Sequence, residues 1–261
     1  MNKNKPVILV TNDDGITANG LHALVRAMRE LGEVVVVAPE SPQSGMGHAI
    51  TISHPLRLEK ADFHSETTYY RTSGTPVDCV KLAVNQVLKK KPDLVVSGIN
   101  HGPNSSVNIF YSGTLSAAME GAIMGIPSIG FSLQNFSENA DMNNASYYAG
   151  LITENYLQDI ENAPRLLNVN IPDPKDGNIK GIKICRQATA RYEEEFEKRT
   201  DPRGVDYFWL TGKLVNHDQK EDTDEYALKE GYVSVVPVKY DLTNYNGLEF
   251  LKSSLFKEEL H

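Results

Sequence analysis

Short apolar runs alternate with helical patterns along the first 170 residues, and this alternation is the strongest constraint on the fold. The runs are too short for helices and rich in valine, isoleucine and leucine, as strands buried on both faces of a parallel sheet are. The predicted strands are Val7–Thr11, Val34–Ala38, Leu94–Ser97, Ile126–Phe131 and Leu166–Ile171. Strands that alternate with helices imply an α/β fold with a doubly wound, mostly parallel sheet.

The segments between these runs carry helix and hairpin signals. Apolar residues recur on one helical face over Leu21–Leu31. Thr75–Asp78 has the pattern of a helix cap, and Cys79 next to it is predicted to lie in the core. The small and apolar residues of Ser112–Met124 predict a helix packed on both sides, and residues 49–73 predict an inserted hairpin or another β excursion.

The tail has a different character. From about residue 178 onward, strand-like runs alternate with charged segments, and Arg191–Arg199 has the charge density of a solvated hairpin or arm. The strand candidates here are Ile179–Cys185, Asp206–Leu210 and Tyr232–Val238. We therefore expect a catalytic core over residues 1–177 and, over residues 178–261, a β-rich extension of that core that carries an oligomerisation arm.

Charge and composition exclude several classes of protein. The chain has 26 basic and 34 acidic residues among 261, and this net charge of −8 argues against binding to nucleic acid or an anionic membrane. No apolar window reaches the roughly eighteen residues of a membrane span, and the first residues have no signal-peptide pattern. Two cysteines make no disulfide framework or zinc motif. We expect a cytoplasmic protein.

The sequence Asn12-Asp13-Asp14-Gly15 follows the first predicted strand directly. Two adjacent carboxylates at the end of a buried strand are costly unless a cation compensates for their desolvation. Oxygen ligands suit magnesium, manganese or calcium. The competing interpretation is a helix cap, but a cap needs one such residue rather than three in a row.

Four polar loops are predicted to meet at one edge of the sheet. Asp13-Asp14, Ser41–His48 and Gly98–Asn104 follow the first three core strands, and Tyr111–Thr114 opens the helix before the fourth. Ligand sites of open parallel sheets lie beyond the carboxyl ends of the strands. The convergence predicts a site, since no loop is specific by itself.

The residue types in these loops indicate phosphate chemistry. Asp13 and Asp14 supply anionic oxygens, and Ser44 and Asn100 supply neutral ones, so together they suit one divalent cation with open positions. Ser112–Thr114 at a helix start offers amide and hydroxyl groups to an anion. A cation beside an anion site predicts phosphate-ester hydrolysis, with Asp13 and Asp14 as the catalytic pair.

Further residues are candidates for contact with the substrate. The candidate phosphate or substrate contacts are Asn12, Gly45, Asn104, Ser112, Gly113 and Thr114. Ser112 taken alone is better explained as an N-cap, and Asn104 could simply close a turn. His48 and His101 are candidate acid–base groups, although each could equally be a solvated loop histidine.

Several long motifs in order make the chain resemble the SurE family of stationary-phase survival proteins. The motifs are VTNDDGI, SGMGHAIT, SGTPVDCV, SGINHGPN and YSGTLSAAMEG, followed by TDEYALKEGYVSVVP at residues 223–237. The resemblance implies a metal-dependent phosphatase acting on nucleoside 5′-monophosphates, and often on 3′-monophosphates. It implies a Rossmann-like core and a C-terminal extension used in dimer or tetramer assembly.

The same resemblance assigns residues. The family's metal ligands match Asp13, Asp14, Ser44 and Asn100, the set obtained above from residue chemistry. The segment Arg186–Leu214 matches no family motif. The nucleophile expected from these features is a metal-activated water.

Two other classes compete with this interpretation. A haloacid-dehalogenase-type phosphatase would use an aspartate nucleophile, but it needs Asp-x-Asp spacing, which points both carboxylates to one side of an extended chain. A non-catalytic nucleotide-binding module is the second class, and the absence of Gly-x-Gly-x-x-Gly after the first strand weakens a dinucleotide role.

Large aromatic residues stand among the charges of the tail, where a monomer would expose them. They are Phe196, Tyr207, Phe208 and Trp209. A second subunit could cover these rings, because aromatic residues are enriched at interfaces. Alternatively, the rings fold back onto the core. The family resemblance favours a homodimer or homotetramer.

Overall fold

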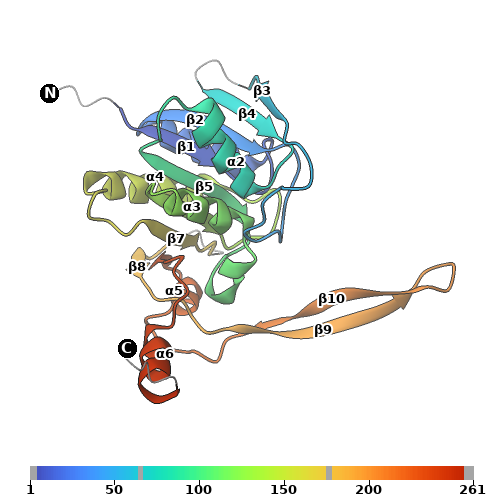
Figure 1. The fold of residues 1–261 in the computed structure, drawn as a ribbon. Helices are drawn as coiled ribbons and strands as arrows, with labels where there is room; N and C mark the ends of the chain where they lie inside the picture. The colour runs from blue at the N-terminus through green and yellow to red at the C-terminus, as the bar shows by residue number, and fades with distance from the viewer. Residues whose placement is uncertain (1–4, 64–66, 175–177, 256–261) are drawn as a thin grey trace, which may run out of the picture.

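The computed structural model describes residues 5–63, 67–174 and 178–255, and its centre is one large mixed sheet (Figure 1). The strands lie in the order β3-β4-β2-β1-β5-β6-β7-β11-β8. Their bounds are β1 Val7–Thr11, β2 Glu33–Pro39, β3 Leu58–Ala61, β4 Thr68–Thr72, β5 Leu94–His101, β6 Ser128–Leu133, β7 Leu166–Ile171, β8 Ile182–Ile184 and β11 Val233–Pro237. This is the mostly parallel α/β sheet that the sequence predicts.

The helices connect these strands and continue to the end of the described chain. They are α1 Asn19–Arg29, α2 Pro76–Leu82, α3 Gly113–Ile123, α4 Asn143–Gln158, α5 Asp224–Lys229 and α6 Tyr245–Phe250, with short π or 3₁₀ turns at Ala83–Val87, Ser106–Phe110 and Leu251–Leu255. No helix in the described ranges is long and apolar enough to cross a membrane.

The order of the parallel strands reverses beside β1. The chain runs from β1 to β2 on one side, and later places β5 on the other side of β1, with all three strands parallel. The connections that follow β1 and β5 therefore run to opposite faces of the sheet, and a crevice opens between them at the carboxyl ends of these strands. Because β1 and β5 are neighbours, the loops that follow them begin side by side at this crevice.

Residues of one strand alternate between two packed layers. Ile8 and Val10 of β1 join the apolar cluster that contains α1 and α4, whereas Leu9 joins the cluster that contains α2 and α3. Cys79 lies fully buried in the second cluster, as predicted. The sheet is thus covered on both faces, which explains its near-continuous apolar strands.

Both edges of the sheet carry additions to the parallel core. β3 and β4 form the antiparallel hairpin expected within residues 49–73, and β4 lies parallel to β2. On the other side, β11 runs antiparallel to β7, and β8 runs parallel to β11. The tail therefore extends the main sheet. The boundary predicted after residue 177 falls at 175–177, outside the described residues.

A separate hairpin leaves the body of the molecule. β9 (Arg191–Thr200) and β10 (Asp206–Val215) pair antiparallel to each other and form their own two-stranded sheet. Figure 1 shows this hairpin, called the arm below, extending far beyond the sheet and its helices. Its first strand is the charged segment predicted to form a solvated hairpin or arm.

Some predicted boundaries differ from the structure. β5 continues to His101, with an irregular register between Ser97 and Asn100, so Asn100 and His101 belong to the strand end rather than to a loop. β6 begins at Ser128, two residues after its predicted start. The sequence analysis assigned no element to α4, whose first turn has no acidic residue and whose N-cap side chain makes no hydrogen bond.

A glycine in α1 sets how closely this helix approaches the sheet. A Cβ atom at Gly20 would lie 2.0 Å from the carbonyl oxygen of Ile99 in β5. Gly20→Ala should therefore lower the free energy of unfolding by about 1–3 kcal/mol through overpacking. In α4, a Cβ atom at Gly150 would meet Ala27 at an ordinary 3.7 Å. Gly150→Ala should raise the free energy of unfolding by roughly 0.5–1 kcal/mol. Urea denaturation of both variants checks the opposite signs, and equal effects would contradict this packing.

Candidate functional site

A cavity of about 680 Å³ lies at the carboxyl ends of the central strands. It is lined by most of the residues that the sequence analysis selected: Asp13, Asp14, Ser44, Gly45, Asn100, His101, Asn104 and Ser112. Four predicted site residues do not line it: Asn12, His48, Gly113 and Thr114. The predicted convergence of the polar loops is therefore present in the structure, and each residue has a definite place in it.

Asp13 is a buried carboxylate with a fixed position. It is only 4% exposed, and the hydroxyl of Thr114 donates a hydrogen bond to its Oδ1. Burial raises the pKa of Asp13 to about 6, the Thr114 hydrogen bond opposes this shift, and the charge of Asp14 adds to it. A nearby cation would relieve both the desolvation and the repulsion.

Gly113 lets helix α3 pack directly onto this carboxylate. A Cβ atom at Gly113 would lie 2.7 Å from Asp13 Cβ and 2.9 Å from Asp13 Oδ2. Thr114 is fully buried, and its hydroxyl is committed to Asp13. We expected Gly113 and Thr114 to face an anion; in the structure they instead position Asp13, because the N-terminus of α3 lies against the end of β1.

Asp14 lies beside His101 on the cavity wall. His101 Nδ1 lies 3.4 Å from Asp14 Oδ2, and within the described chain His101 Nε2 is buried without a hydrogen-bond partner. A contact of this length is weak, and it leaves Asp14 able to bind a cation. His101 is thus placed beside the carboxylate pair, as an acid–base group would be.

Asn100 lines the cavity, and its amide nitrogen is bonded to the backbone. Its Nδ2 donates to the carbonyl oxygens of His101 at 3.2 Å and Gly102 at 2.7 Å. Both partners are acceptors, so the amide nitrogen must face them and the carbonyl oxygen is the free end. Ser44 lies exposed in the loop after β2 and lines the same cavity. The two neutral oxygens therefore accompany the two carboxylates.

This donor set fits a hard divalent cation. In the described ranges, no group of three or more His, Cys, Asp or Glu side chains is placed to hold a metal ion. Ser44 and Asn100, which line the same cavity as Asp13 and Asp14, could add neutral oxygens, and water could complete the set. That mixture of carboxylate, carbonyl and water oxygens is typical of magnesium and manganese, and of calcium with more ligands.

Ser112 is an N-cap at the edge of the cavity. The Ser112 Oγ accepts a hydrogen bond of 3.0 Å from Leu115 N, and Ser112 lines the cavity. Ser112 therefore places the start of α3, the positive end of the helix dipole, at the cavity wall. Gly45, with a φ of +73°, lines the cavity from the loop after β2.

Asn104 is held by a buried set of polar side chains. Its backbone N donates to Asn170 Oδ1 at 2.7 Å, and its Nδ2 donates to Ser132 Oγ at 2.8 Å. Asn168 Nδ2 donates to the Asn104 carbonyl at 2.9 Å. These contacts anchor the loop after β5 to β6 and β7, so Asn104 has a structural task in addition to its place on the cavity wall.

Asn12 shapes the turn after β1 instead of lining the cavity. Its Nδ2 donates to the Gly15 carbonyl at 2.9 Å, and its buried Oδ1 has no partner among the described residues. The expected contact between Asn12 and the substrate is therefore absent from the cavity wall. The residue closes the turn that carries Asp13 and Asp14.

His48 does not line the cavity, so the cavity gives no support to its predicted acid–base role. His48 Nε2 lies 3.0 Å from Oε2 of the buried Glu120, whose Oε1 accepts from Lys81 Nζ at 2.6 Å. Glu120 belongs to α3, so this contact ties the loop after β2 to that helix. His48 therefore anchors the loop that carries Ser44.

The sequence analysis missed one wall of the cavity. Asn108, Phe136, Tyr192, Leu210, Thr211 and Gly212 also line it. Tyr192 and Leu210–Gly212 belong to the root of the arm, in the segment without a recognisable motif. In the sequence, Tyr192 and Phe136 stand out only as aromatic residues within polar stretches. That signal does not show that they line the same cavity as Asp13 and Asp14.

A single methyl group should disturb the carboxylate pair. We expect Gly113→Ala to displace Asp13, because the added Cβ atom cannot occupy its place without movement of that side chain. Affinity for Mn²⁺ should fall at least about tenfold, measured by titration calorimetry. Gly150→Ala, which makes the same chemical change far from the cavity, should leave the affinity unchanged. Unchanged affinity in Gly113→Ala would contradict the placement of the cation at Asp13.

Comparison with known proteins identifies the family of this chain. A family model described as "Survival protein SurE" matches residues 8–194. The chain is 58% identical to "5'-nucleotidase SurE" of Christiangramia forsetii over 97% of this chain and 98% of that protein. It is 56% identical to the protein of the same name from Flavobacterium johnsoniae, over the same shares. The crystal structure of the SurE protein from Aquifex aeolicus matches with a TM-score of 0.81 and 43% identity, over 95% of this chain and 98% of that chain. The chain belongs to the SurE family.

Proposed function

We propose that this protein is a 5′-nucleotidase that hydrolyses nucleoside monophosphates to nucleoside and phosphate, with one divalent cation per subunit. The observation that carries the proposal is the cavity, which brings Asp13, Asp14, Ser44 and Asn100 to one edge of the sheet beside the N-terminus of α3. The activity in the names of the SurE relatives from Christiangramia forsetii and Flavobacterium johnsoniae supports it.

Different residues of the cavity would bind the cation and the phosphate. Asp13 and Asp14 would hold the cation together with Ser44 and Asn100. A divalent cation there supplies charge that polarises a phosphoryl oxygen and lowers the pKa of a water molecule. The positive end of the α3 dipole, which starts at Ser112 on the cavity wall, would favour the phosphate anion, and the cavity volume leaves room for the nucleoside.

His101 is the acid–base candidate that the geometry supports. Its ring lies beside Asp14 on the cavity wall, so a proton can pass between these groups or to a bound water. Asp13 is a poor covalent nucleophile, since it is buried and its carboxylate is held by Thr114. This favours attack by water over a phospho-aspartate.

Hydrolysis and its dependence on a cation test the proposal directly. Activity toward a nucleoside 5′-monophosphate should vanish on chelation and return with added Mn²⁺ or Mg²⁺. Asp13→Asn should lower kcat/KM at least about 100-fold, since the amide keeps the shape but loses the charge. Asp222→Asn, at an exposed position, is the control. If the cation-loaded protein hydrolyses no nucleotide, the proposal is wrong and the non-catalytic nucleotide-binding module is favoured. If a phosphorylated aspartate can be trapped, attack by water is wrong and an aspartate is the nucleophile.

Asp13→Asn, which should lower activity, should raise the stability of the fold when no cation is present. The folded-state pKa of Asp13 is raised from 3.8 to about 6. The ionised carboxylate therefore destabilises the fold as the pH rises through this interval, by up to about 3 kcal/mol at neutral pH. With chelator, Asp13→Asn should have a higher Tm than the wild type at about pH 7.5, and this advantage should shrink toward about pH 4. Saturating Mn²⁺ should reverse the order, and a variant that is less stable in chelator would contradict the burial cost.

We further propose that the protein assembles through the arm, as a homodimer or homotetramer. In the arm, Phe208 of β10 pairs with Lys198 of β9, and Leu210 pairs with Phe196. The rings of Phe196, Phe208 and Trp209 are all more than half exposed. These apolar side chains have no cover within the described chain, and burying them against a second copy would be favourable.

Light scattering at micromolar concentration should give at least the mass of a dimer. Replacing residues 195–209 with two glycines should lower that mass, because it removes the exposed rings but keeps Tyr192 and Leu210–Gly212. Cation affinity should remain, since Asp13 and Asp14 lie outside the arm. A monomeric intact protein would refute the assembly.

A further inference from the structure

The motif that begins with Thr223 and Asp224 has no part in the chemistry described so far. Thr223 caps helix α5, and Asp224 is the first residue of that helix. Asp224 has no exposed surface, and burial raises its pKa against the opposing effect of its hydrogen bonds. A carboxylate buried at such cost is held by specific partners, so its contacts indicate its task.

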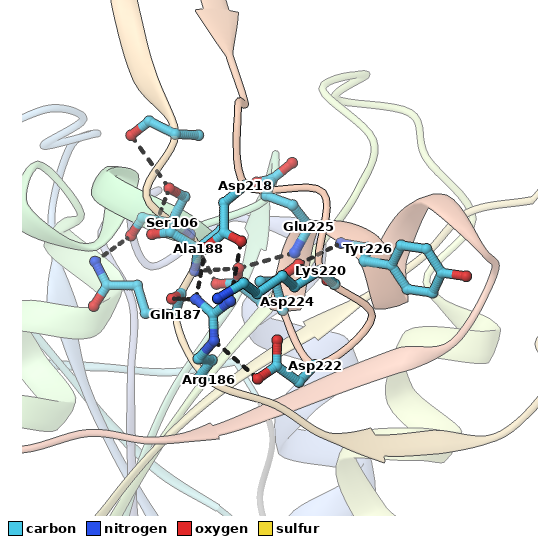
Figure 2. A network of polar contacts seen from close by, with 12 residues as sticks. Ser106, Arg186, Gln187, Ala188, Asp218, Lys220, Asp222, Asp224, Glu225 and Tyr226 are labelled. Atoms are coloured by element: carbon cyan, nitrogen blue, oxygen red, sulfur yellow. Dashed lines mark hydrogen bonds and ion pairs between the residues drawn. The ribbon is translucent and has the colours of Figure 1, made fainter.

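Asp224 joins two segments that are far apart in the sequence (Figure 2). Its Oδ2 accepts from Ser106 N at 2.8 Å. Its Oδ1 accepts from Ala188 N at 2.9 Å and from Glu225 N at 2.9 Å. One carboxylate therefore fixes the turn after β5 to the chain that enters the arm.

Neighbouring contacts reinforce the same junction. Gln187 Nε2 donates to the Ser106 carbonyl at 2.9 Å, and Ser106 Oγ donates to the Ala188 carbonyl at 3.1 Å. The Ser105 hydroxyl donates to Glu225. Ser106 itself has a φ of 53°, an uncommon conformation for a residue with a side chain. The turn is thus held in one conformation by several bonds.

An outer layer of ion pairs braces the loop before α5. Arg186 Nη1 lies 2.6 Å from Asp218 Oδ2, and Arg186 Nε lies 3.0 Å from Asp222 Oδ2. These side chains are more exposed than Asp224, so each pair contributes less than the buried carboxylate. Figure 2 shows Arg186 between these two aspartates, beside the buried junction.

Each of the two joined segments leads into a different wall of the cavity. The turn after β5 continues into Asn108, Tyr111 and Ser112, which line the cavity. The chain after Ala188 continues into β9 with Tyr192, and its partner β10 contributes Leu210–Gly212. Asp224 itself does not line the cavity.

We propose that Asp224 is a positioning residue of this site, which sets the separation between the wall at Asn108–Ser112 and the wall formed by the root of the arm. The proposal rests on the proposed nucleotidase function. The proposed cation ligands lie on the loops after β1 and β2 and at the end of β5, and none of them belongs to this junction. Asp224 therefore governs how the cavity holds the part of the substrate beyond the phosphate, and the residues at the cation govern the chemical step.

The key variant is Asp224→Asn. An asparagine has one side-chain oxygen, so an NH₂ group must face either Ser106 N–H or the pair of amides at Ala188 and Glu225. The matched control is Asp222→Asn, the same change two residues earlier at an exposed ion pair. Gln187→Met removes the bond to the Ser106 carbonyl without leaving a charged group buried, and serves if Asp224→Asn does not fold.

Two substrates separate positioning from chemistry. For adenosine 5′-monophosphate, Asp224→Asn should raise KM about tenfold, and Gln187→Met about threefold. For p-nitrophenyl phosphate, whose leaving group is smaller, kcat should stay within about twofold of the wild type. Asp222→Asn should match the wild type with both substrates. An unchanged KM for the nucleotide, or an equal fall in kcat with both substrates, would overturn the proposal.

Amide hydrogen exchange tests the junction without any substrate. In Asp224→Asn, the amides of Ser106 and Ala188 should exchange at least about tenfold faster than in the wild type, and Asp222→Asn should leave them protected. In Gln187→Met, faster exchange at Ser106 is the corresponding result. Unchanged exchange in the variants would overturn the junction. If the wild type hydrolyses neither substrate with any cation, the proposed function fails, while the exchange result still decides whether Asp224 joins the two walls.

Discussion

The site depends on a carboxylate buried at the carboxyl end of β1. Asp13 is held there by the Thr114 hydroxyl and by the close approach of α3 that Gly113 permits. Its desolvation is unfavourable for the ionised group and would be relieved by a cation. Under our proposal, the burial that weakens the cation-free fold therefore also provides affinity for a divalent ion.

The cavity is a joint product of the core and of the extension. The parallel strands place the loops after β1, β2 and β5 at one edge, because the strand order reverses beside β1. The opposite wall comes from the root of the arm, which Asp224 fixes against the turn after β5. The arm thus has two tasks in our proposals, since its root completes the cavity and its exposed rings mediate assembly.

Hydrogen bonds assign several predicted site residues to roles behind the cavity surface. Thr114 and Gly113 position Asp13, Asn12 closes the turn after β1, and His48 anchors the loop of Ser44 through Glu120. Each of these residue types could equally have faced a ligand. A polar side chain at a strand end has two sets of partners available, and only the packing of α3 against β1 and the loop after β2 decides between them.

The sequence by itself determined the layered sheet, since apolar runs with period and length typical of buried strands can be covered only by helices on both faces. It also determined that Asp13, Asp14, Ser44 and Asn100 share one edge, because the loops that follow parallel strands meet there. Only the tertiary structure decided that Tyr192 and Leu210–Gly212 line the same cavity, and that Asp224 joins Ser106 to Ala188. Ser106 lies 118 residues before Asp224, and Ala188 lies 36 residues before it. These contacts follow no period of the sequence, so their physical reason lies in how the strands, turns and arm pack together.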